Sequence, residues 1–522
     1  MGHDRRDLAS REIMRRAVPG PVVALALLAI GAAPALAQDP SRATEPQAIA
    51  QLEEATAALS GAEPSADVTN ELRELALALP ALDGAERRRA RRILARPPHG
   101  EANGSDSFYG AVWGGPATAE RQFYDSPGGQ FRIHYVISGE DAPDPEDATG
   151  EVDVPDYVEL VANRADTSEV VQNDNLGWPA PKSDGDLGGL DADGMSRTDI
   201  YLADLDGGLF GYAAIDVQSD GCDSAPYRCF AYLVLDNDYA EFSNPVEALE
   251  ATAAHEYNHV LQFNLDTNQD SWMLESTATW AEEKVFPDAD DWVRTFMGDW
   301  ADSPHIPITK SDSKYYGSAV WNHWLDSRYG ADPILHAWQL SRAVSPKDYA
   351  VGAYDRAIRE AAGVNRGFAR AFGQFAAATS EWRSGYGGFP DAADLPDVRR
   401  QGTLTRGRKG TGLTLDNTAY RLFGVDPRGA GEITLRVAAP SGLRAGIALV
   451  ARKGPNLAPD RVIRRFKEIP GTGSGSVTLR GARGFDRITA VVVNADGRVT
   501  GPKNGGEFDY RRDNQRLTAK VR

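Results

Sequence analysis

Cysteine and positive charge are both scarce in this 522-residue chain. Its 56 Lys and Arg stand against 75 Asp and Glu, which gives a formal net charge of −19 and argues against nucleic acid or an anionic membrane as a partner. The two cysteines, Cys222 and Cys229, are too few for a cysteine-based metal site and predict one disulfide in an oxidising compartment. Long apolar runs are also lacking after residue 30, so we expect no stable membrane insertion.

The single long apolar run lies near the amino terminus, in the layout of a secretory signal peptide. A polar segment that is basic toward its end precedes Val22–Ile30, and Ala35-Leu36-Ala37 is a small-x-small cleavage site before Gln38. We therefore predict that residues 1–37 are a signal peptide and that the protein is secreted. An uncleaved anchor is the alternative, although the run is short for a membrane span.

What the chain does contain is an H-E-x-x-H pattern, which begins at His255 and ends at His259. On a helix these two imidazoles lie one turn apart on the same face, where both can bind one metal ion. Glu256 is rotated by about a quarter turn, which places it beside the open position of the metal as a general base for water. Asn244-Pro245 predicts the start of this helix. A surface helix with two unrelated histidines is the alternative.

A catalytic zinc site takes three protein ligands, so a third ligand should lie nearby. A second predicted helix, residues 271–283, follows after a short turn, and folding the two helices back on each other brings Glu275 level with His259. Glu282 and Glu283 lie two turns further on, roughly 10–12 Å away at 1.5 Å per residue, and are poorer candidates. A histidine six residues after the motif, the other common third ligand, is absent. The predicted Zn²⁺ ligands are His255, His259 and Glu275.

These residues resemble those of a known group of enzymes. H-E-x-x-H followed by a glutamate on the next helix is similar to the gluzincin zinc peptidases, the group of thermolysin and the aminopeptidase N-like enzymes, and Trp272–Trp280 resembles the aminopeptidase segment that carries the third ligand. A closer resemblance, over about Ser126 to Gly330, is to a family of secreted bacterial metalloproteases. The shared landmarks are Phe131–Tyr135, Val154–Glu159, Asp236–Tyr239, Ala253–Glu256 and Glu275–Trp280.

This resemblance implies a zincin-like catalytic domain, a bound zinc ion and a protein or peptide substrate. The G-x-M-E-N segment that holds a free amino terminus in the aminopeptidases is absent, which favours an endopeptidase. Those enzymes also place an oxyanion-binding tyrosine just before a Y-x-K-G-like helix start, and Tyr315 and Tyr316 lie near that place, although their spacing to Gly317 differs. Such a donor contributes on the order of 2.7–4 kcal/mol to transition-state stabilisation. His323 is a further candidate donor, and packing is the alternative role of all three side chains.

The rest of the chain divides by composition. Residues 38–105 show helical patterning and a basic run, Glu86–Arg92, and are either a helical propeptide that masks the site or a permanent spacer. Residues 106–398 are the predicted catalytic domain, with strands at 131–137 and 232–235 and helices toward its end; the resemblance implies that the second strand pairs with extended substrate. Residues 399–522 predict a small β-sandwich. The predicted fold class is therefore α+β.

Two acidic loops, Asp147–Glu159 and Asp184–Asp193, resemble calcium loops, although neither keeps the full D-x-[DN]-x-[DN]-G spacing. Calcium is thus a second candidate cation, and acidic turns without a metal are the alternative.

The sequence as a whole predicts a secreted zinc-dependent metallopeptidase, in particular an endopeptidase, with Glu256 as general base. One alternative is a catalytically inactive exported surface-binding protein whose working part is the C-terminal β region. Retention of Glu256 argues against it, because binding alone does not require a general base. The other is metal-assisted hydrolysis of a bond other than a peptide, since zinc-activated water attacks several electrophiles.

Overall fold

The computed structural model describes residues 43–60, 67–97, 121–185, 197–205, 209–217, 222–223, 228–310, 314–341, 349–502 and 508–522. The predicted signal peptide, the predicted boundary at residue 105 and most of the second acidic loop lie outside these ranges. The chain is mixed α/β, with helices and several sheets, in agreement with the predicted α+β class. Within the described ranges, no helix is both long enough and apolar enough to cross a bilayer.

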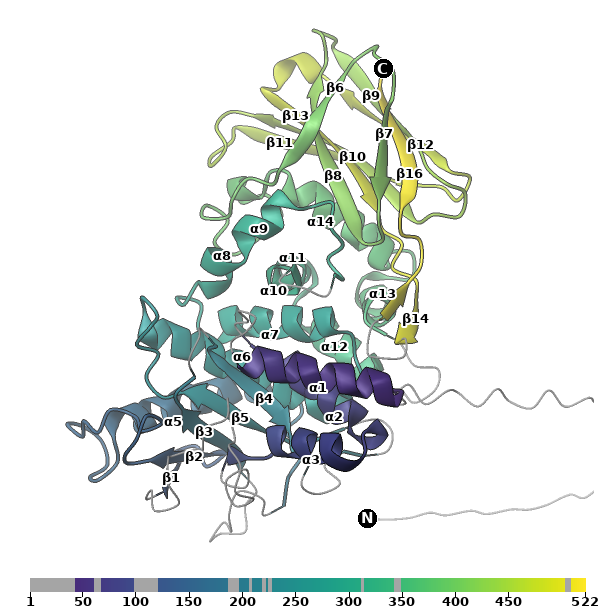
Figure 1. The fold of residues 1–522 in the computed structure, drawn as a ribbon. Coiled ribbons are helices and arrows are strands. Elements are labelled where there is room, and N and C mark those ends of the chain that lie inside the picture. Colours follow the sequence, from purple (N-terminus) through teal and green to yellow (C-terminus); the bar gives the residue numbers. More distant parts are fainter. Residues whose placement is uncertain are drawn as a thin grey trace, which may run out of the picture. The chain divides into compact units, whose positions relative to one another are not determined.

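The N-terminal region is helical, as its patterning predicts. Its elements, purple in Figure 1, are α1 (Glu45–Leu59), α2 (Thr69–Ala78), the short η1 (Leu79–Ala81) and α3 (Gly84–Ile93). A capping box starts α1, where the backbone N–H of Thr44 donates to Gln47 Oε1 at 2.9 Å. The basic run lies on α3, and one of its arginines, Arg89, pairs with Glu53 of α1 at 2.9 Å. The run is therefore part of a folded helix.

A five-stranded sheet lies next to these helices. Its strands are β1 (Arg121–Asp125), β2 (Phe131–Val136), β3 (Thr198–Ala203), β4 (Gly211–Ile215) and β5 (Ala231–Asp236). The order is β1-β2-β3-β5-β4; β2, β3 and β5 run parallel, and the two outer strands are antiparallel to their neighbours. The predicted strands at 131–137 and 232–235 are confirmed. However, the second is interior; the outer strands of the described sheet are β1 and β4.

Both faces of the sheet are buried. Ile200 and Leu202 of β3 pack into one core together with α5 (Asp156–Glu169) and α6 (Pro245–Asp266). Tyr201 and Ala203 point to the other face and pack against α1, α2 and α3. The N-terminal helices therefore complete a three-layer arrangement, because without them the second face of the sheet would lie open to water.

Helix α5 was not predicted from the sequence, because residues up to Glu159 were expected to form an acidic loop. The helix begins at Asp156, buries Val158, Val161, Ala162 and Ala165, and continues into one π-helical stretch, η2 (Val170–Asn175). Apolar residues at this spacing of three, one and three positions are typical of one face of a helix. Before the helix, loop backbone N–H groups donate to nearby carboxylates: Thr149 N to Asp156 Oδ1 at 3.0 Å and Glu151 N to Glu159 Oε1 at 2.6 Å. These carboxylates stabilise the turn.

A helical region follows the sheet. After α6 it contains α7 (Ser271–Val285), α8 (Asp291–Thr295), α9 (Met297–Asp302), α10 (Lys314–Gly317), α11 (Ala319–Tyr329), α12 (Asp332–Ser341), α13 (Val351–Ala362), α14 (Phe368–Thr379) and η4 (Trp382–Ser384). Tryptophans fill its core, including Trp272, Trp280 and Trp321. This core holds α7 firmly, since Asn322 Nδ2 donates to Ser276 O at 2.8 Å from behind the helix.

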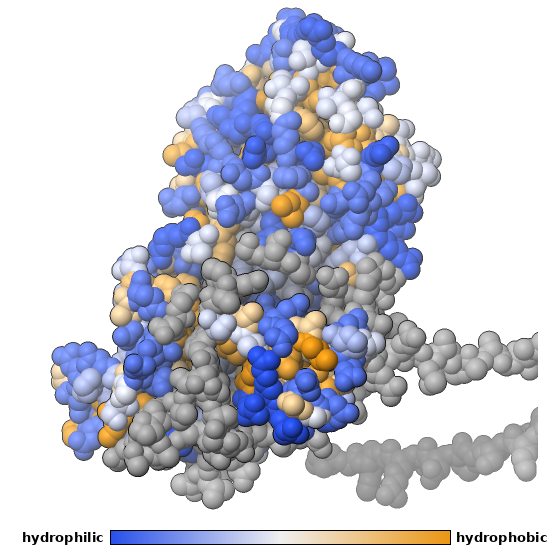
Figure 2. All heavy atoms as spheres, in the orientation of Figure 1, coloured by the Kyte–Doolittle hydropathy of each residue, from blue (hydrophilic) through white to orange (hydrophobic). Residues whose placement is uncertain are grey.

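The C-terminal region is built of strands. They are β6 (Arg400–Thr405), β7 (Thr411–Leu415), β8 (Ala419–Asp426), β9 (Glu432–Ala438), β10 (Ala445–Lys453), β11 (Arg461–Ile469), β12 (Ser474–Arg480), β13 (Arg487–Asn494), β14 (Val499–Pro502), β15 (Phe508–Tyr510) and β16 (Gln515–Val521), with one 3₁₀ turn, η5 (Ala482–Gly484). Two sheets, β11-β10-β13-β8-β6 and β12-β9-β16-β7, share one apolar core. On the face drawn in Figure 2, hydrophilic residues dominate the surface of these strands. The β-like runs of the sequence at residues 413–415, 432–437, 445–450 and 487–493, which predict strands, lie within β7, β9, β10 and β13.

Candidate metal centre

Two consecutive helices carry the predicted ligands. Helix α6 starts as its sequence predicts, with Asn244 at the N-cap and Pro245 as its first residue, and α7 follows after a short turn. The Asn244 side chain bonds to Glu247 Oε2 at 2.7 Å instead of capping the backbone. The predicted disulfide between Cys222 and Cys229 is present, and Cys229 N donates to Phe263 O at 2.9 Å, which ties the loop to α6.

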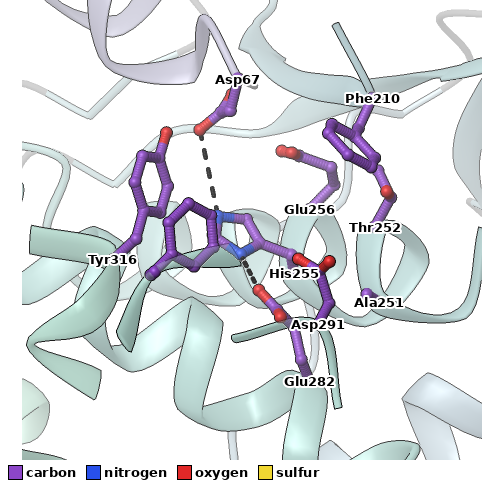
Figure 3. A pocket seen from close by; sticks show the side chains of 10 residues that line it. Asp67, Phe210, Ala251, Thr252, His255, Glu256, Glu282, Asp291 and Tyr316 are labelled. Carbon is purple, nitrogen blue, oxygen red and sulfur yellow. Dashed lines mark hydrogen bonds and ion pairs between the residues drawn. The ribbon is translucent and has the colours of Figure 1, made fainter. Parts of the chain in front are cut away.

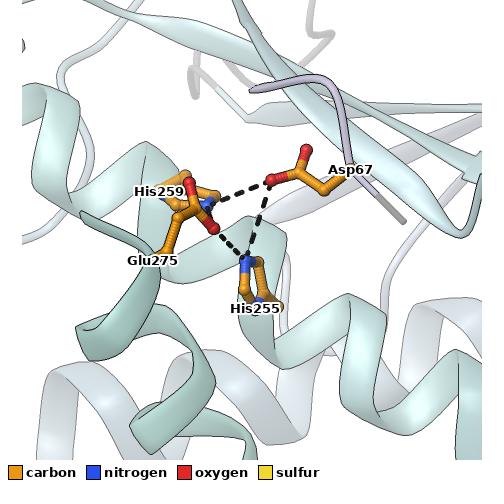
Figure 4. A group of neighbouring side chains, drawn as sticks. All are labelled: Asp67, His255, His259 and Glu275. Atoms are coloured by element: carbon orange, nitrogen blue, oxygen red, sulfur yellow. Dashed lines mark hydrogen bonds and ion pairs between the residues drawn. The ribbon is translucent and has the colours of Figure 1, made fainter. Parts of the chain in front are cut away.

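The helices bring the three predicted ligands together (Figure 4). His255 Nε2 lies 3.1 Å from Glu275 Oε2, and His259 Nε2 lies 3.5 Å from the same oxygen. A fourth side chain, Asp67, approaches from the N-terminal region, with its Oδ2 at 3.9 Å and 3.8 Å from the two imidazole nitrogens. One ligand atom from each of the four residues lies within 4.8 Å of the others, and all four residues are buried. The arrangement therefore converges on one small volume.

The rear nitrogen of each imidazole is held by an oxygen. Glu282 Oε1 lies 2.5 Å from His255 Nδ1, and Gln262 Oε1 lies 2.8 Å from His259 Nδ1. Gln262 is itself fixed, because its Nε2 donates to Asn258 Oδ1 at 2.6 Å. An acceptor at Nδ1 places the proton there and leaves the Nε2 lone pair facing the centre, which is the usual support of a metal-ligating histidine.

The donor set fits a zinc ion. Two imidazole nitrogens and a carboxylate oxygen are ligands that zinc accepts. His259 Nε2 is buried, and its nearest carboxylate oxygens, on Glu275 and Asp67, lie beyond the 2.7–3.2 Å of an ordinary hydrogen bond. Four carboxylates, at 6% exposure or less, surround only two imidazoles; they belong to Asp67, Glu256, Glu275 and Glu282. A divalent cation would neutralise this buried excess of negative charge.

Residues near Asp67 contact two of the other three acidic groups of the centre. Thr69 Oγ1 donates to Glu256 Oε2 at 3.1 Å and accepts from Ala213 N of β4 at 2.8 Å. Asn70 Nδ2 donates to Glu275 Oε1. The general-base candidate and the third ligand candidate are thus both in contact with the start of α2.

The carboxylates have different proton affinities. Burial raises the pKa of Glu275, but His259 and His255 outweigh burial and bring it to about 2, so this carboxylate stays ionised. Burial, reinforced by Asp67, raises the pKa of Glu256 well above its ordinary value. Burial and the charge of Glu275 raise the pKa of Asp67 to about 6, against the opposing effect of both histidines. Glu256 therefore binds a proton more readily than Glu275 does.

A small cavity adjoins the centre (Figure 3). Asp67, Phe210, Thr252, His255, Glu256 and Tyr316 are among the residues that line it. The Tyr316 ring lies 6.0 Å from the His255 ring, between centroids, and its hydroxyl is on the same side of the cavity as Asp67. The cavity is small, with a volume of about 40 Å³ for the centres of water molecules.

The three candidate oxyanion donors are not equally placed. Tyr316 lines the cavity, and the Tyr315 ring packs against the Tyr316 ring at a centroid distance of 4.7 Å. His323 does not line the cavity; it lies on α11, buried against Trp292 at a centroid distance of 4.4 Å. The structure therefore brings Tyr316 to the site and places His323 in the tryptophan-rich core.

Two further acidic groups occur in the described part of the chain: Asp236, Asp238 and Glu241, and Glu283, Asp290 and Asp391. Neither contains a histidine. The predicted calcium loops are not among these groups, and within the second loop the described Asp184 pairs with Arg96 at 2.5 Å.

Several residues of the centre were not predicted from the sequence. Glu282 had been considered only as a ligand, although its position two turns after Glu275 places it on the same face of α7 and offers a signal for a supporting role. Gln262, three residues after His259, carries the same kind of signal. Asp67, Thr69 and Asn70 carry none. Comparison with models of known protein families and with curated protein sequences finds no match to this chain.

Proposed function

We propose that this protein is a zinc-dependent metallopeptidase of the gluzincin type, acting as an endopeptidase. The observation that carries the proposal is the convergence of His255, His259 and Glu275 around one volume, with Glu256 beside it and oxygen acceptors behind both imidazoles. The resemblance of H-E-x-x-H and the following glutamate to the gluzincin peptidases supports the same function. Under this proposal residues 106–398 form a zincin-like domain, residues 399–522 form a β-sandwich, and the protein is secreted.

In this mechanism zinc, when bound by the three ligands, supplies Lewis acidity that polarises a carbonyl and makes water more acidic. Glu256 accepts the proton of the attacking water and then transfers it to the nitrogen of the leaving amine. Burial, reinforced by Asp67, raises the pKa of Glu256 well above its ordinary value and so makes this carboxylate a stronger proton acceptor. Tyr316 donates a hydrogen bond to the oxygen that develops negative charge, and Glu282 and Gln262 keep the imidazoles oriented.

An extended peptide would bind along β4. This strand is at the edge of the described sheet. It lies close to the cavity because Gly211 packs against Thr252, which lines the cavity: a Cβ at Gly211 would lie 2.7 Å from Thr252 Cγ2. Strand addition at such an edge uses main-chain hydrogen bonds and does not need a free terminus, which suits an endopeptidase. This replaces the interior strand β5 as the substrate-pairing strand.

The test compares four proteins: the full chain, Asp67→Ala, and each of these combined with Glu256→Gln. We expect one zinc per chain in all four by metal analysis. In a digest of an unbiased peptide library, the forms that retain Glu256 should produce internal cleavages, and Glu256→Gln should reduce their rate by at least about 100-fold. If zinc is bound but no cleavage depends on Glu256 in either background, the peptidase proposal is wrong.

An inactive exported binding protein is the second candidate. The observation that favours it is the occupation of the site by the start of α2, where Thr69 bonds to Glu256. This candidate predicts bound zinc without Glu256-dependent cleavage, in the full chain and in Asp67→Ala alike.

A further inference from the structure

The segment Asp67–Asn70 touches every chemically important part of the metal centre. Asp67 Oδ2 lies within 4 Å of both imidazole nitrogens, the Thr69 hydroxyl donates to Glu256, and the Asn70 amide donates to Glu275. Three of these four residues therefore contact the centre, each at a different acidic or metal-binding group. General packing does not explain such a concentration of polar contacts. The Thr69 contact occupies the general-base candidate, whereas the Asn70 contact is to Glu275 Oε1 and leaves Oε2 facing the imidazoles.

The same segment occupies the edge of β4. Asp67 pairs with Gly211 in a parallel bridge, and the backbone N–H of Ala213, which an added strand would need, donates instead to Thr69 Oγ1. A peptide bound along β4 would need these positions, so it and residues 67–69 exclude each other.

The space that remains is too small for a substrate. A buried water needs roughly 10–15 Å³ measured for the centre of a water-sized sphere, so the 40 Å³ beside His255 holds a few water molecules and no peptide.

We propose that Asp67–Asn70 is an autoinhibitory plug: Asp67 takes the fourth position on the metal, Thr69 and Asn70 hold Glu256 and Glu275, and the backbone covers the substrate edge of β4. The plug deepens the proposed peptidase function and rests on the metal centre described above. A zinc site with four protein ligands is closed, whereas a catalytic site keeps one position open, so displacement of Asp67 converts the first state into the second.

The plug is fixed by α2 and by the segment after α3. Arg73, buried on α2, donates through Nη1 to Gln269 O at 2.6 Å and through Nη2 to Ser271 Oγ at 3.0 Å, at the turn between α6 and α7. Further along, buried Arg96 pairs with Asp184 and Asp216, each at 2.5 Å. Because α1, α2 and α3 also cover one face of the sheet, loss of the whole helical layer would expose that face to water.

The experiment uses the full chain loaded with Co²⁺, whose visible absorption reports its ligands, and titrates it with acetohydroxamate, a small chelator that needs an open metal position. The parent is compared with Asp67→Ala, with Asp67→Asn and with a matched control, Asp83→Ala, which removes an exposed carboxylate before α3. We expect both Asp67 variants to keep the metal, to change the absorption spectrum and to bind acetohydroxamate at least about tenfold more tightly than the parent and the control, because a site closed nine-tenths of the time loses that factor in apparent affinity.

Two outcomes would overturn the plug: equal acetohydroxamate affinity in the parent and both Asp67 variants, or loss of the metal from both variants. Thermal unfolding of each protein shows whether a variant is folded, and Asp67→Asn keeps the shape of the side chain. Tighter acetohydroxamate binding without peptide cleavage would support the plug and count against the peptidase, so the two proposals fail separately.

Discussion

The contact between Glu282 and His255 provides a quantitative test of the metal centre. Glu282 Oε1 lies 2.5 Å from His255 Nδ1, and the two residues are only 5% and 6% exposed, so water cannot easily replace the carboxylate. A carboxylate in this position orients the ring and makes its other nitrogen a stronger ligand. Loss of such a partner typically lowers metal affinity 10–100-fold, which corresponds to about 1.4–2.7 kcal/mol.

Two substitutions separate the charge of Glu282 from its hydrogen bond. Glu282→Gln keeps an oxygen acceptor of the same reach, and we expect zinc to bind about tenfold more weakly. Glu282→Leu removes the acceptor and leaves His255 Nδ1 without a partner in a buried site, and we expect a loss of about 100-fold. The dissociation constant for zinc is measured by competition with a chromophoric chelator at one fixed neutral pH.

A matched control comes from the same helix as His255. Glu250→Gln removes a carboxylate that pairs with Arg164 at 2.8 Å and touches neither histidine, so its zinc affinity should equal that of the parent. If Glu282→Leu also binds zinc as tightly as the parent, His255 is not a ligand and the proposed centre is incorrect.

Two further predictions concern the ligand set and the candidate donor in the core. Glu275→Ala should lose stoichiometric zinc after dialysis, as measured by metal analysis, and one retained zinc per chain would contradict its role as third ligand. Burial, aided by Lys284, lowers the pKa of His323 to about 3, so below the unfolded-state value of about 6.5 only the unfolded chain binds the proton, and stability falls as the pH is lowered. At pH 5 the loss of stability from His323 amounts to about 2 kcal/mol. Urea unfolding at pH 5 and pH 8 measures it: between these pH values His323→Leu should lose about 2 kcal/mol less stability than the parent. Equal losses in the two proteins would contradict the burial argument.

The helix pair, and the meeting of its two histidines with Glu275, could be predicted because the information for them is local. Asn244-Pro245 marks the start of α6, the spacing of the histidines fixes their common face, and the short turn forces α7 back alongside α6. Glu275 then follows from helical geometry alone. The strand segments of the C-terminal region were predictable for the same reason, since alternation and turn residues act over a few positions.

The start of α2 could not be predicted in this way. Thr69 lies 187 residues before the glutamate that it contacts, and an Asp-x-Thr-Asn sequence has no periodicity that marks a partner. Its position depends on the burial of α1, α2 and α3 against the sheet, a tertiary effect that local patterns do not encode. The prediction of a propeptide or a spacer for residues 38–105 therefore stopped at composition, whereas the structure brings Asp67 and Thr69 of this region into contact with the site.

The same contacts allow an opposite interpretation, in which Asp67 is a permanent fourth ligand and the metal is structural. The two interpretations differ in what they require of Asp67, and its distances and its place in the chain favour a displaceable ligand. Glu275 Oε2 lies 3.1 Å and 3.5 Å from the imidazole nitrogens, whereas Asp67 Oδ2 lies 3.9 Å and 3.8 Å away and belongs to a segment outside the helix pair. A structural metal would also have no use for Glu256, a buried carboxylate beside the candidate centre that is not one of its four candidate ligands. Under the plug proposal Glu256, at 1% exposure, acts on water once Asp67 leaves and the fourth position opens.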